Sequence, residues 1–260
     1  MTIRKMGFLL VALMLGLGLF GCKGSDDPSQ LDSDSADSDS SLSVQEPPVV
    51  SDDTAVSGEG SLTEADRQAV AEGKTVKVVN SYYATLAEAV EFANQNGGGT
   101  IYLLADTICT ASDQPPMIEF RTTVRVKSIE GDVFTVRRGE GQTFEMFRLT
   151  DGVVTFDKVI FDGTSPSAVD RPIIVVSNLA WLTLGSGVVL KNSNSNDRAS
   201  AISVSGADAK LTIQKGCTIE DCGGTGSVVF NDDATIIDEG VVLHNNTAAE
   251  GDYGGSSVTG

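Results

Sequence analysis

The sequence contains few of the residues that build metal centres. It has one histidine and four cysteines in 260 residues. A zinc site takes three or four protein ligands, with its histidines and cysteines at short, regular spacing. No such spacing occurs here, so we expect neither a metal site nor a resident cofactor.

The cysteines are also too few for a disulfide framework. Cys22 has a separate explanation, given below, which leaves Cys109, Cys217 and Cys222. An odd number argues against a set of bridges, although one pair plus one free thiol satisfies the count. Cys217 stands where related segments of the chain carry valine, which indicates a small side chain packed inside the fold. A Cys217–Cys222 bridge is the alternative.

Basic residues are scarce as well. The chain has 18 Lys and Arg against 36 Asp and Glu, a net charge of −18. Residues 61–260 alone have 26 acidic and 15 basic side chains, and 15 minus 26 gives −11. Such a surface repels nucleic acid and anionic membranes, so we expect no nucleic-acid partner. It also opposes polyanionic ligands unless a local basic patch offsets it.

There is a single long apolar run, residues 7–20, preceded by two basic residues. It is too short to span a bilayer comfortably. It ends in Leu19-Phe20-Gly21-Cys22, which resembles the bacterial lipoprotein signal, where a cysteine after a small residue is acylated. The resemblance implies a signal sequence over residues 1–22 and attachment to the lipid bilayer through Cys22. An ordinary secretory signal is the alternative.

Residues 23–60 have almost nothing to bury. They contain Ser-Asp repeats, with ten acidic residues and one basic residue. Like charges repel, so we expect an extended acidic tether. The aspartates lack the glycine and glutamate that an EF-hand needs at its sixth and twelfth positions, which leaves only loose divalent binding.

What the rest of the chain does have is a repeat. Five-residue segments begin at residues 159, 188, 217 and 241, so they recur after 29, 29 and 24 residues. A period in the twenties, carried by strand-forming residues, is typical of a solenoid whose turns stack on one another. The segments are Val159-Ile160-Phe161-Asp162-Gly163, Val188-Val189-Leu190-Lys191-Asn192, Cys217-Thr218-Ile219-Glu220-Asp221 and Val241-Val242-Leu243-His244-Asn245.

Each repeat contains three short strands. A strand such as 182–184 precedes the segment, and a third strand such as 201–204 follows it. Three strands in 24 to 29 residues form one turn of a three-sided parallel β-helix, so we expect one all-β domain over residues 61–260. Strand alternation places side chains inward at Leu182, Leu184, Val188 and Leu190, and outward at Thr183 and Val189.

A helix is expected at the start of this domain. Thr85 and Glu88 have the spacing of a capping box, apolar residues follow at helical spacing, and three glycines after Asn96 end the pattern. We therefore predict a helical cap over about residues 85–96, between strands at 76–79 and 100–104. Such a cap would cover the open end of the stack.

The run Tyr83-Ala84-Thr85-Leu86-Ala87-Glu88-Ala89-Val90, joined to the repeats after residue 159, resembles the pectate-lyase-like right-handed β-helix superfamily. More narrowly, it resembles the adhesin-like surface members. The resemblance covers roughly residues 75–260. It implies the architecture and leaves the activity open, because this fold serves lyases, hydrolases and non-catalytic binders.

Polysaccharide lyases of this superfamily hold calcium with acidic residues and use an Arg or Lys as base, so the resemblance implies Ca²⁺ only if the protein is a lyase. Asp162, Lys191 and Glu220 fall in one aligned column and are the weak catalytic candidates, although a salt-bridged surface column is the favoured interpretation. The paired aspartates, His-Gly and Arg-x-Lys of the related hydrolases are missing. The wider set of candidates is Asp157, Asp197 and Asp221, with Arg171 or Arg198 as the cation.

Two further sets of residues have structural and functional interpretations. Asn192, Asp221 and Asn245 follow successive segments, where they can form a stacked ladder and tolerate the left-handed backbone of a sharp turn. Trp181, Tyr82 and Tyr83 can stack on sugar rings, although a single tryptophan in a strand is commonly a packing residue.

The last residues, 254–260, predict the start of another third strand, with no capping helix after it. We expect either that the chain is a truncated relative of longer surface proteins or that the open end of the stack pairs edge to edge with a second copy. Taken together, the sequence predicts a lipid-anchored bacterial cell-envelope protein, on the outer membrane or cell surface. We expect a non-catalytic, adhesin-like or glycan-binding role, with host surfaces or extracellular glycans as partners. The alternatives are a polysaccharide lyase or hydrolase, and a structural envelope protein.

Overall fold

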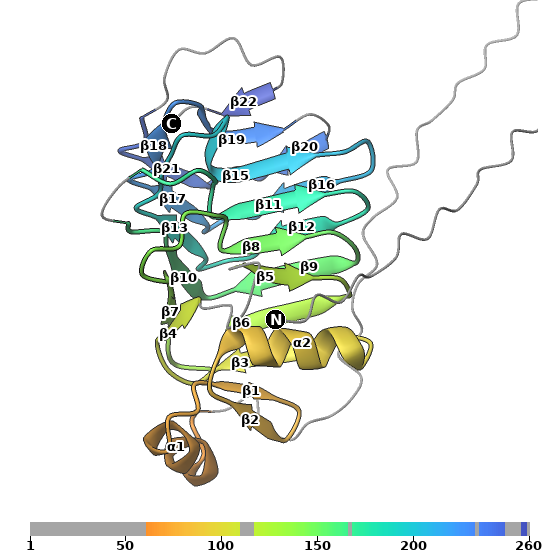
Figure 1. Cartoon of the computed structure of the whole chain (residues 1–260), viewed down its shortest axis with the longest axis vertical. Coiled ribbons are helices and arrows are strands. Elements are labelled where there is room, and N and C mark those ends of the chain that lie inside the picture. The colour runs from red at the N-terminus through yellow and green to blue at the C-terminus, as the bar shows by residue number, and fades with distance from the viewer. Residues whose placement is uncertain (1–60, 110–116, 166–167, 232–233, 248–255, 259–260) are drawn as a thin grey trace, which may run out of the picture. The chain divides into compact units, whose positions relative to one another are not determined.

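The computed structural model describes residues 61–109, 117–165, 168–231, 234–247 and 256–258 (Figure 1). The expected signal sequence, the acidic tether and Cys22 lie outside the described residues. Within those residues, no helix is both long and apolar enough to cross a membrane.

The chain winds into a parallel β-solenoid of about five turns, as the repeats predict. Each turn adds one strand to each of three sheets, which form three sides of the stack (Figure 1). Sheet A consists of β2 (Ser81–Tyr83), β1 (Val76–Val78), β3 (Gly99–Leu103), β6 (Val124–Ser128), β9 (Val153–Asp157), β12 (Trp181–Leu184), β16 (Lys210–Ile213) and β20 (Ala234–Ile237), in that order.

Sheet B consists of β4 (Thr107–Cys109), β7 (Phe134–Arg138), β10 (Val159–Asp162), β13 (Val189–Lys191), β17 (Thr218–Glu220) and β21 (Val242–His244). Sheet C consists of β5 (Ile118–Phe120), β8 (Phe147–Leu149), β11 (Ile174–Ser177), β15 (Ala199–Ser205), β19 (Ser227–Asn231) and β22 (Ser256–Val258). A short pair, β14 (Asn194–Ser195) and β18 (Gly223–Gly224), lies between sheets B and C along the chain.

The predicted helix is present as α2 (Leu86–Gln95), with Thr85 as N-cap and a capping box to Glu88. It buries Leu86 and three further apolar residues in the core at the first turn. A second helix, α1 (Glu64–Ala71), was not predicted. Its capping box joins Thr63 to Asp66, and Asp66 also accepts hydrogen bonds from Lys77 and Tyr82 at 2.9 Å each.

The interior is a continuous apolar column. The inward positions predicted from strand alternation are buried, and four phenylalanine rings pack inside the first three turns with centroids 4.8 to 6.1 Å apart. The four rings are those of Phe120, Phe147, Phe156 and Phe161.

Cys217 is buried in this core, as predicted. The alternative Cys217–Cys222 bridge is wrong, because Cys109, Cys217 and Cys222 are all free thiols.

The C-terminal strand differs in direction from the prediction. β22 lies in sheet C, where a third strand was expected, but it pairs antiparallel with β19. β20 and β21, at the far edge of sheets A and B, have no further strand beside them among the described residues. Ile237, which is aligned with the fully buried Ile213, is accordingly 37% exposed.

Candidate functional site

The candidate site is a hollow at the corner between sheets A and B, and differences in turn length create it. A single residue, Lys158, separates β9 from β10, whereas residues 129–133 separate β6 from β7 and residues 185–188 separate β12 from β13. The short turn therefore lies between two longer ones on the neighbouring coils. The hollow has a volume of about 270 Å³, which is small for a ligand site and suits one sugar-sized group.

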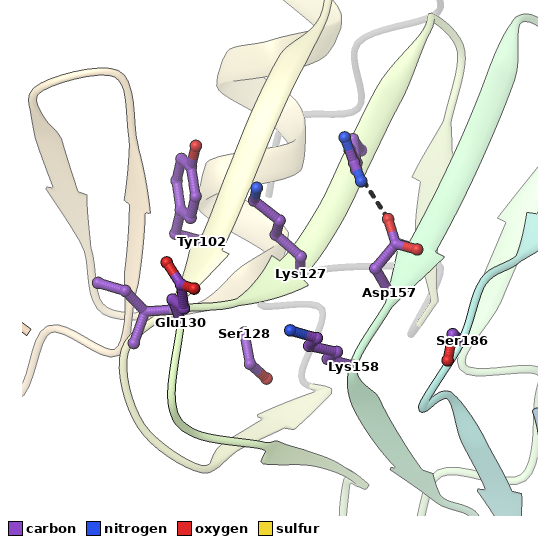
Figure 2. A pocket seen from close by; sticks show the side chains of 9 residues that line it. Tyr102, Lys127, Ser128, Glu130, Asp157, Lys158 and Ser186 are labelled. Carbon is purple, nitrogen blue, oxygen red and sulfur yellow. Dashed lines mark hydrogen bonds and ion pairs between the residues drawn. The ribbon is translucent and has the colours of Figure 1, made fainter. Parts of the chain in front are cut away.

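Charged and hydroxyl side chains surround the hollow (Figure 2). Ile129 and Ser128 lie at its buried side, and the Ser128 hydroxyl accepts a hydrogen bond of 2.9 Å from the Phe134 amide. The rest of the lining includes both cations and acids, which gives the hollow both donors and acceptors. Its lining consists of Tyr102, Arg125, Lys127, Ser128, Ile129, Glu130, Asp157, Lys158 and Ser186.

Two contacts between adjacent strands order this lining. Arg125 Nε lies 2.7 Å from Asp157 Oδ2, an ion pair between β6 and β9 (Figure 2). Lys127 Nζ lies 5.2 Å from the ring centroid of Tyr102, close enough for a cation–π contact. Gly185 packs against the same carboxylate, because a Cβ built on it would lie 1.9 Å from Asp157 Oδ1.

Lys158 has an unusual backbone conformation. Its φ is 48°, in the left-handed region that favours glycine and asparagine. Five other described non-glycine residues lie in this region: Asn178, Asn192, Asp221 and Asn245, which tolerate it well, and the β-branched Val79, which does not. A lysine in that conformation costs about 1 kcal/mol, and such strain concentrates at functional positions.

The outer face of sheet A is basic although the protein is acidic. Its strands contain four cations and a single acid, Asp157. Four of the charged and aromatic residues form one cross-strand column on β1, β3, β6 and β9, which ends at the hollow. Asp66 of α1 pairs with Lys77 and Asp157 pairs with Arg125, so this face has four cations against two acids, a small local excess of positive charge that favours an anionic ligand. The cations are Lys77, Arg125, Lys127 and Lys210, and the column is Lys77, Tyr102, Lys127 and Asp157.

The three aromatic candidates from the sequence all make contacts within the protein. Trp181 lies under Lys210, whose Nζ is 4.2 Å from the ring centroid. The Tyr82 hydroxyl donates to Asp66, and its ring faces Lys77 at 5.4 Å. Tyr83 packs on Phe92 of α2, with ring centroids 5.6 Å apart. None of the three lines the hollow.

The three weak catalytic candidates lie on a different sheet. The register pairs Asp162 with Lys191, and Lys191 with Glu220, so they occupy one outward column of sheet B. Burial alone would raise the pKa of Asp162, but hydrogen bonds from Thr164 and Asn192 outweigh it and hold the pKa below its usual value. These residues do not line the hollow.

The turn candidates adopt the backbone that the sequence suggested. Asn192, Asp221 and Asn245 have φ of 58°, 52° and 51°. The Asn192 amide group donates to Asp162 Oδ1 at 3.0 Å, on the preceding coil.

The remaining acid and cation candidates are dispersed. Asp197 forms an ion pair with Arg171 at 3.0 Å. Arg198 lies over the Phe230 ring at 4.4 Å. Among all the sequence candidates, only Asp157 lines the hollow. Among the described residues, no group of three or more His, Cys, Asp and Glu is placed to hold a metal ion.

Sequence reasoning missed most of the hollow. The signal that could have revealed it is spacing: two residues separate the inward Phe156 and Val159, whereas three separate the equivalent Leu184 and Val188. That one-residue difference predicts a recessed turn.

Comparison with known proteins found no matching family model, curated protein or solved structure. The fold therefore defines the class, and this chain is a parallel β-solenoid protein.

Proposed function

We propose that this protein is a lipid-anchored, adhesin-like module of the bacterial cell surface that binds glycans without catalysis. The observation that carries the proposal is the hollow, where Lys127 and Lys158 supply donors, and Asp157 and Glu130 supply acceptors, beside the ring of Tyr102. Sugar hydroxyls both donate and accept hydrogen bonds, so a mixed lining of this kind suits them.

The charge of the face supports a sugar that bears an anionic group. Four of the five charged strand residues of sheet A are cations. The hollow is about the size of one sugar unit, and the outer face of sheet A provides further polar contacts along the stack. The resemblance to the pectate-lyase-like superfamily and the lipoprotein signal at Cys22 support the surface location.

A glycan array tests this proposal, with neutral, uronate-containing and sulfated glycans presented to residues 61–260. Binding to a hit is then measured by calorimetry. Lys158→Asn removes the lysine while keeping a residue that accepts the left-handed backbone, so we expect binding to weaken at least tenfold. Lys215→Asn, at an exposed turn outside the hollow, is the matched control. Equal affinity for both variants, or no binding to any glycan, would count against the proposal.

The alternative is a polysaccharide lyase, favoured by a lysine and an acid adjacent in the hollow, Lys158 and Asp157. Lyase activity would produce unsaturated uronates, seen as new ultraviolet absorbance when the protein meets pectin and calcium. If that absorbance appears and is lost in Asp157→Asn or Lys158→Asn, the non-catalytic proposal is wrong. Absence of both binding and turnover would leave a structural envelope role.

A further inference from the structure

The outer face of sheet B contains two cross-strand columns on β7, β10, β13 and β17. In the first, which we call the charge column, positive and negative residues alternate. In the second, the β-branched column, isoleucine and valine lie between two threonines. The charge column is Arg137, Asp162, Lys191 and Glu220, and the β-branched column is Thr135, Ile160, Val189 and Thr218.

Both columns are self-complementary under two-fold symmetry. Consider an axis parallel to the strands that passes between β10 and β13, the middle pair of the six strands in sheet B. It places each column of one copy against the same column of the other, in reversed order. Arg137 then faces Glu220 of the second copy, and Asp162 faces Lys191. Every facing pair in the charge column is of opposite sign.

The β-branched column matches itself in the same way. The axis that aligns the charges places Ile160 against Val189 of the second copy and Thr135 against Thr218. An apolar pair thus lies at the centre with threonines on either side. A single two-fold rotation therefore pairs complementary residues in both columns at once. A random arrangement of charges would not be expected to do so.

Contacts within one copy leave at least part of each of these groups available. The hydrogen bonds that Asp162 accepts from Thr164 and Asn192 all go to Oδ1. The Arg137 pair with Asp106 is 3.3 Å long, and both side chains are more than half exposed, so water screens it. Within the described part of the chain, neither Lys191 nor Glu220 takes part in an ion pair at 4.0 Å or less. Ile160 and Val189 remain partly exposed to solvent.

We propose that the outer face of sheet B is a docking surface for a second copy of this chain, in a face-to-face two-fold dimer. Six strands about 4.8 Å apart, each presenting about 10 Å of length, give roughly 300 Å² per copy. A standard stable interface buries about 800 Å² per partner. The dimer is therefore weak and forms where the protein is concentrated.

Sedimentation equilibrium at rising protein concentration tests the proposal on the full chain, in low and high salt. We expect a monomer–dimer equilibrium that weakens with salt, because the facing pairs are exposed to solvent. In the dimer, Glu220→Lys puts a lysine opposite Arg137 at each of the two symmetry-related contacts, and it should weaken dimerisation at least tenfold. The control is Asp208→Lys, the same charge change on an exposed turn away from sheet B, which should leave the equilibrium unchanged.

A charge swap gives the decisive outcome. Arg137→Glu combined with Glu220→Lys restores opposite charges at every facing position, so it should recover dimerisation to within about threefold of the original. Circular dichroism checks that each variant keeps its fold. A dimer that is insensitive to Glu220→Lys would point to the open edge of β20 and β21 and overturn the proposal, as would a strict monomer at about 1 mM.

Discussion

Arg125 and Asp157 form an ion pair at 2.7 Å between two adjacent coils, and the pair borders the hollow on sheet A. The backbone of Gly185, on the next coil, closes the other side of the carboxylate. Three successive coils therefore fix the position of one side chain.

This arrangement predicts a strong effect for Gly185→Ala. The new methyl group would lie 1.9 Å from Asp157 Oδ1 and 3.0 Å from the Phe156 carbonyl, so the carboxylate must move away from Arg125. We expect a loss of about 1–3 kcal/mol in the free energy of unfolding, measured by urea denaturation. In an Asp157→Ala background the same substitution should cost about 1 kcal/mol less. Additive effects would show that the two residues are not coupled.

The phenylalanine cluster predicts a large difference between two chemically identical substitutions. Phe156 is fully buried among three other rings, whereas Phe144 is 47% exposed. Phe156→Ala should lower the free energy of unfolding by about 3–5 kcal/mol, because it leaves a cavity in the core. Phe144→Ala should change it by less than about 1 kcal/mol. Similar losses in both variants would be incompatible with this core.

The three described cysteines should be inert in the folded protein. Burial raises the pKa of Cys109, Cys217 and Cys222 to about 12, so almost no thiolate exists at neutral pH. In a Cys22→Ser variant, a thiol reagent should label none of them rapidly in buffer and all three in denaturant. A count of one in denaturant would indicate a Cys217–Cys222 bridge.

Asp162 predicts a pH dependence of stability. Its pKa is lower in the folded protein than the unfolded value of about 3.9, so its contribution is present above that value and is lost as the pH falls towards the folded pKa. Asp162→Asn should therefore be less stable than the original at pH 7, and the difference should shrink by pH 3. Asp132→Asn, at an exposed turn, is the control. A constant difference across this range would exclude titration of Asp162 as the cause.

The proposed lipid anchor at Cys22 predicts how the protein is retained. Cys22→Ala removes the sulfur that would accept the lipid, so we expect loss of labelling by a clickable fatty acid and release from the membrane fraction. Retention of the variant in membranes would argue against anchoring through this residue.

Most of the fold could be predicted from the repeats in the sequence. Inward positions such as Leu184 and Leu190 were predicted because strand alternation and burial follow one rule, and α2 was predicted because its capping box precedes an apolar helical pattern. α1 was missed, since it is short and mostly polar and Asp66 replaces the usual Glu. The direction of β22 depends on a chain reversal that no local pattern encodes.

The hollow could not be derived in the same way. It arises from a difference between neighbouring turns, so its residues, such as Tyr102 and Ser186, share no motif along the chain. Trp181 was a candidate only because tryptophan can stack on sugar rings. The position of Trp181 under Lys210 depends on the register of β12 and β16, which the residue type does not predict.

The one-coil spacing of the strands has an evolutionary consequence. Because β12 and β16 repeat the same register as their neighbours, duplication or deletion of a complete coil would lengthen or shorten the protein by about 4.8 Å without demanding a new kind of contact. Homologues that differ in coil number would then differ in the length of the stack while keeping the same contacts between neighbouring coils.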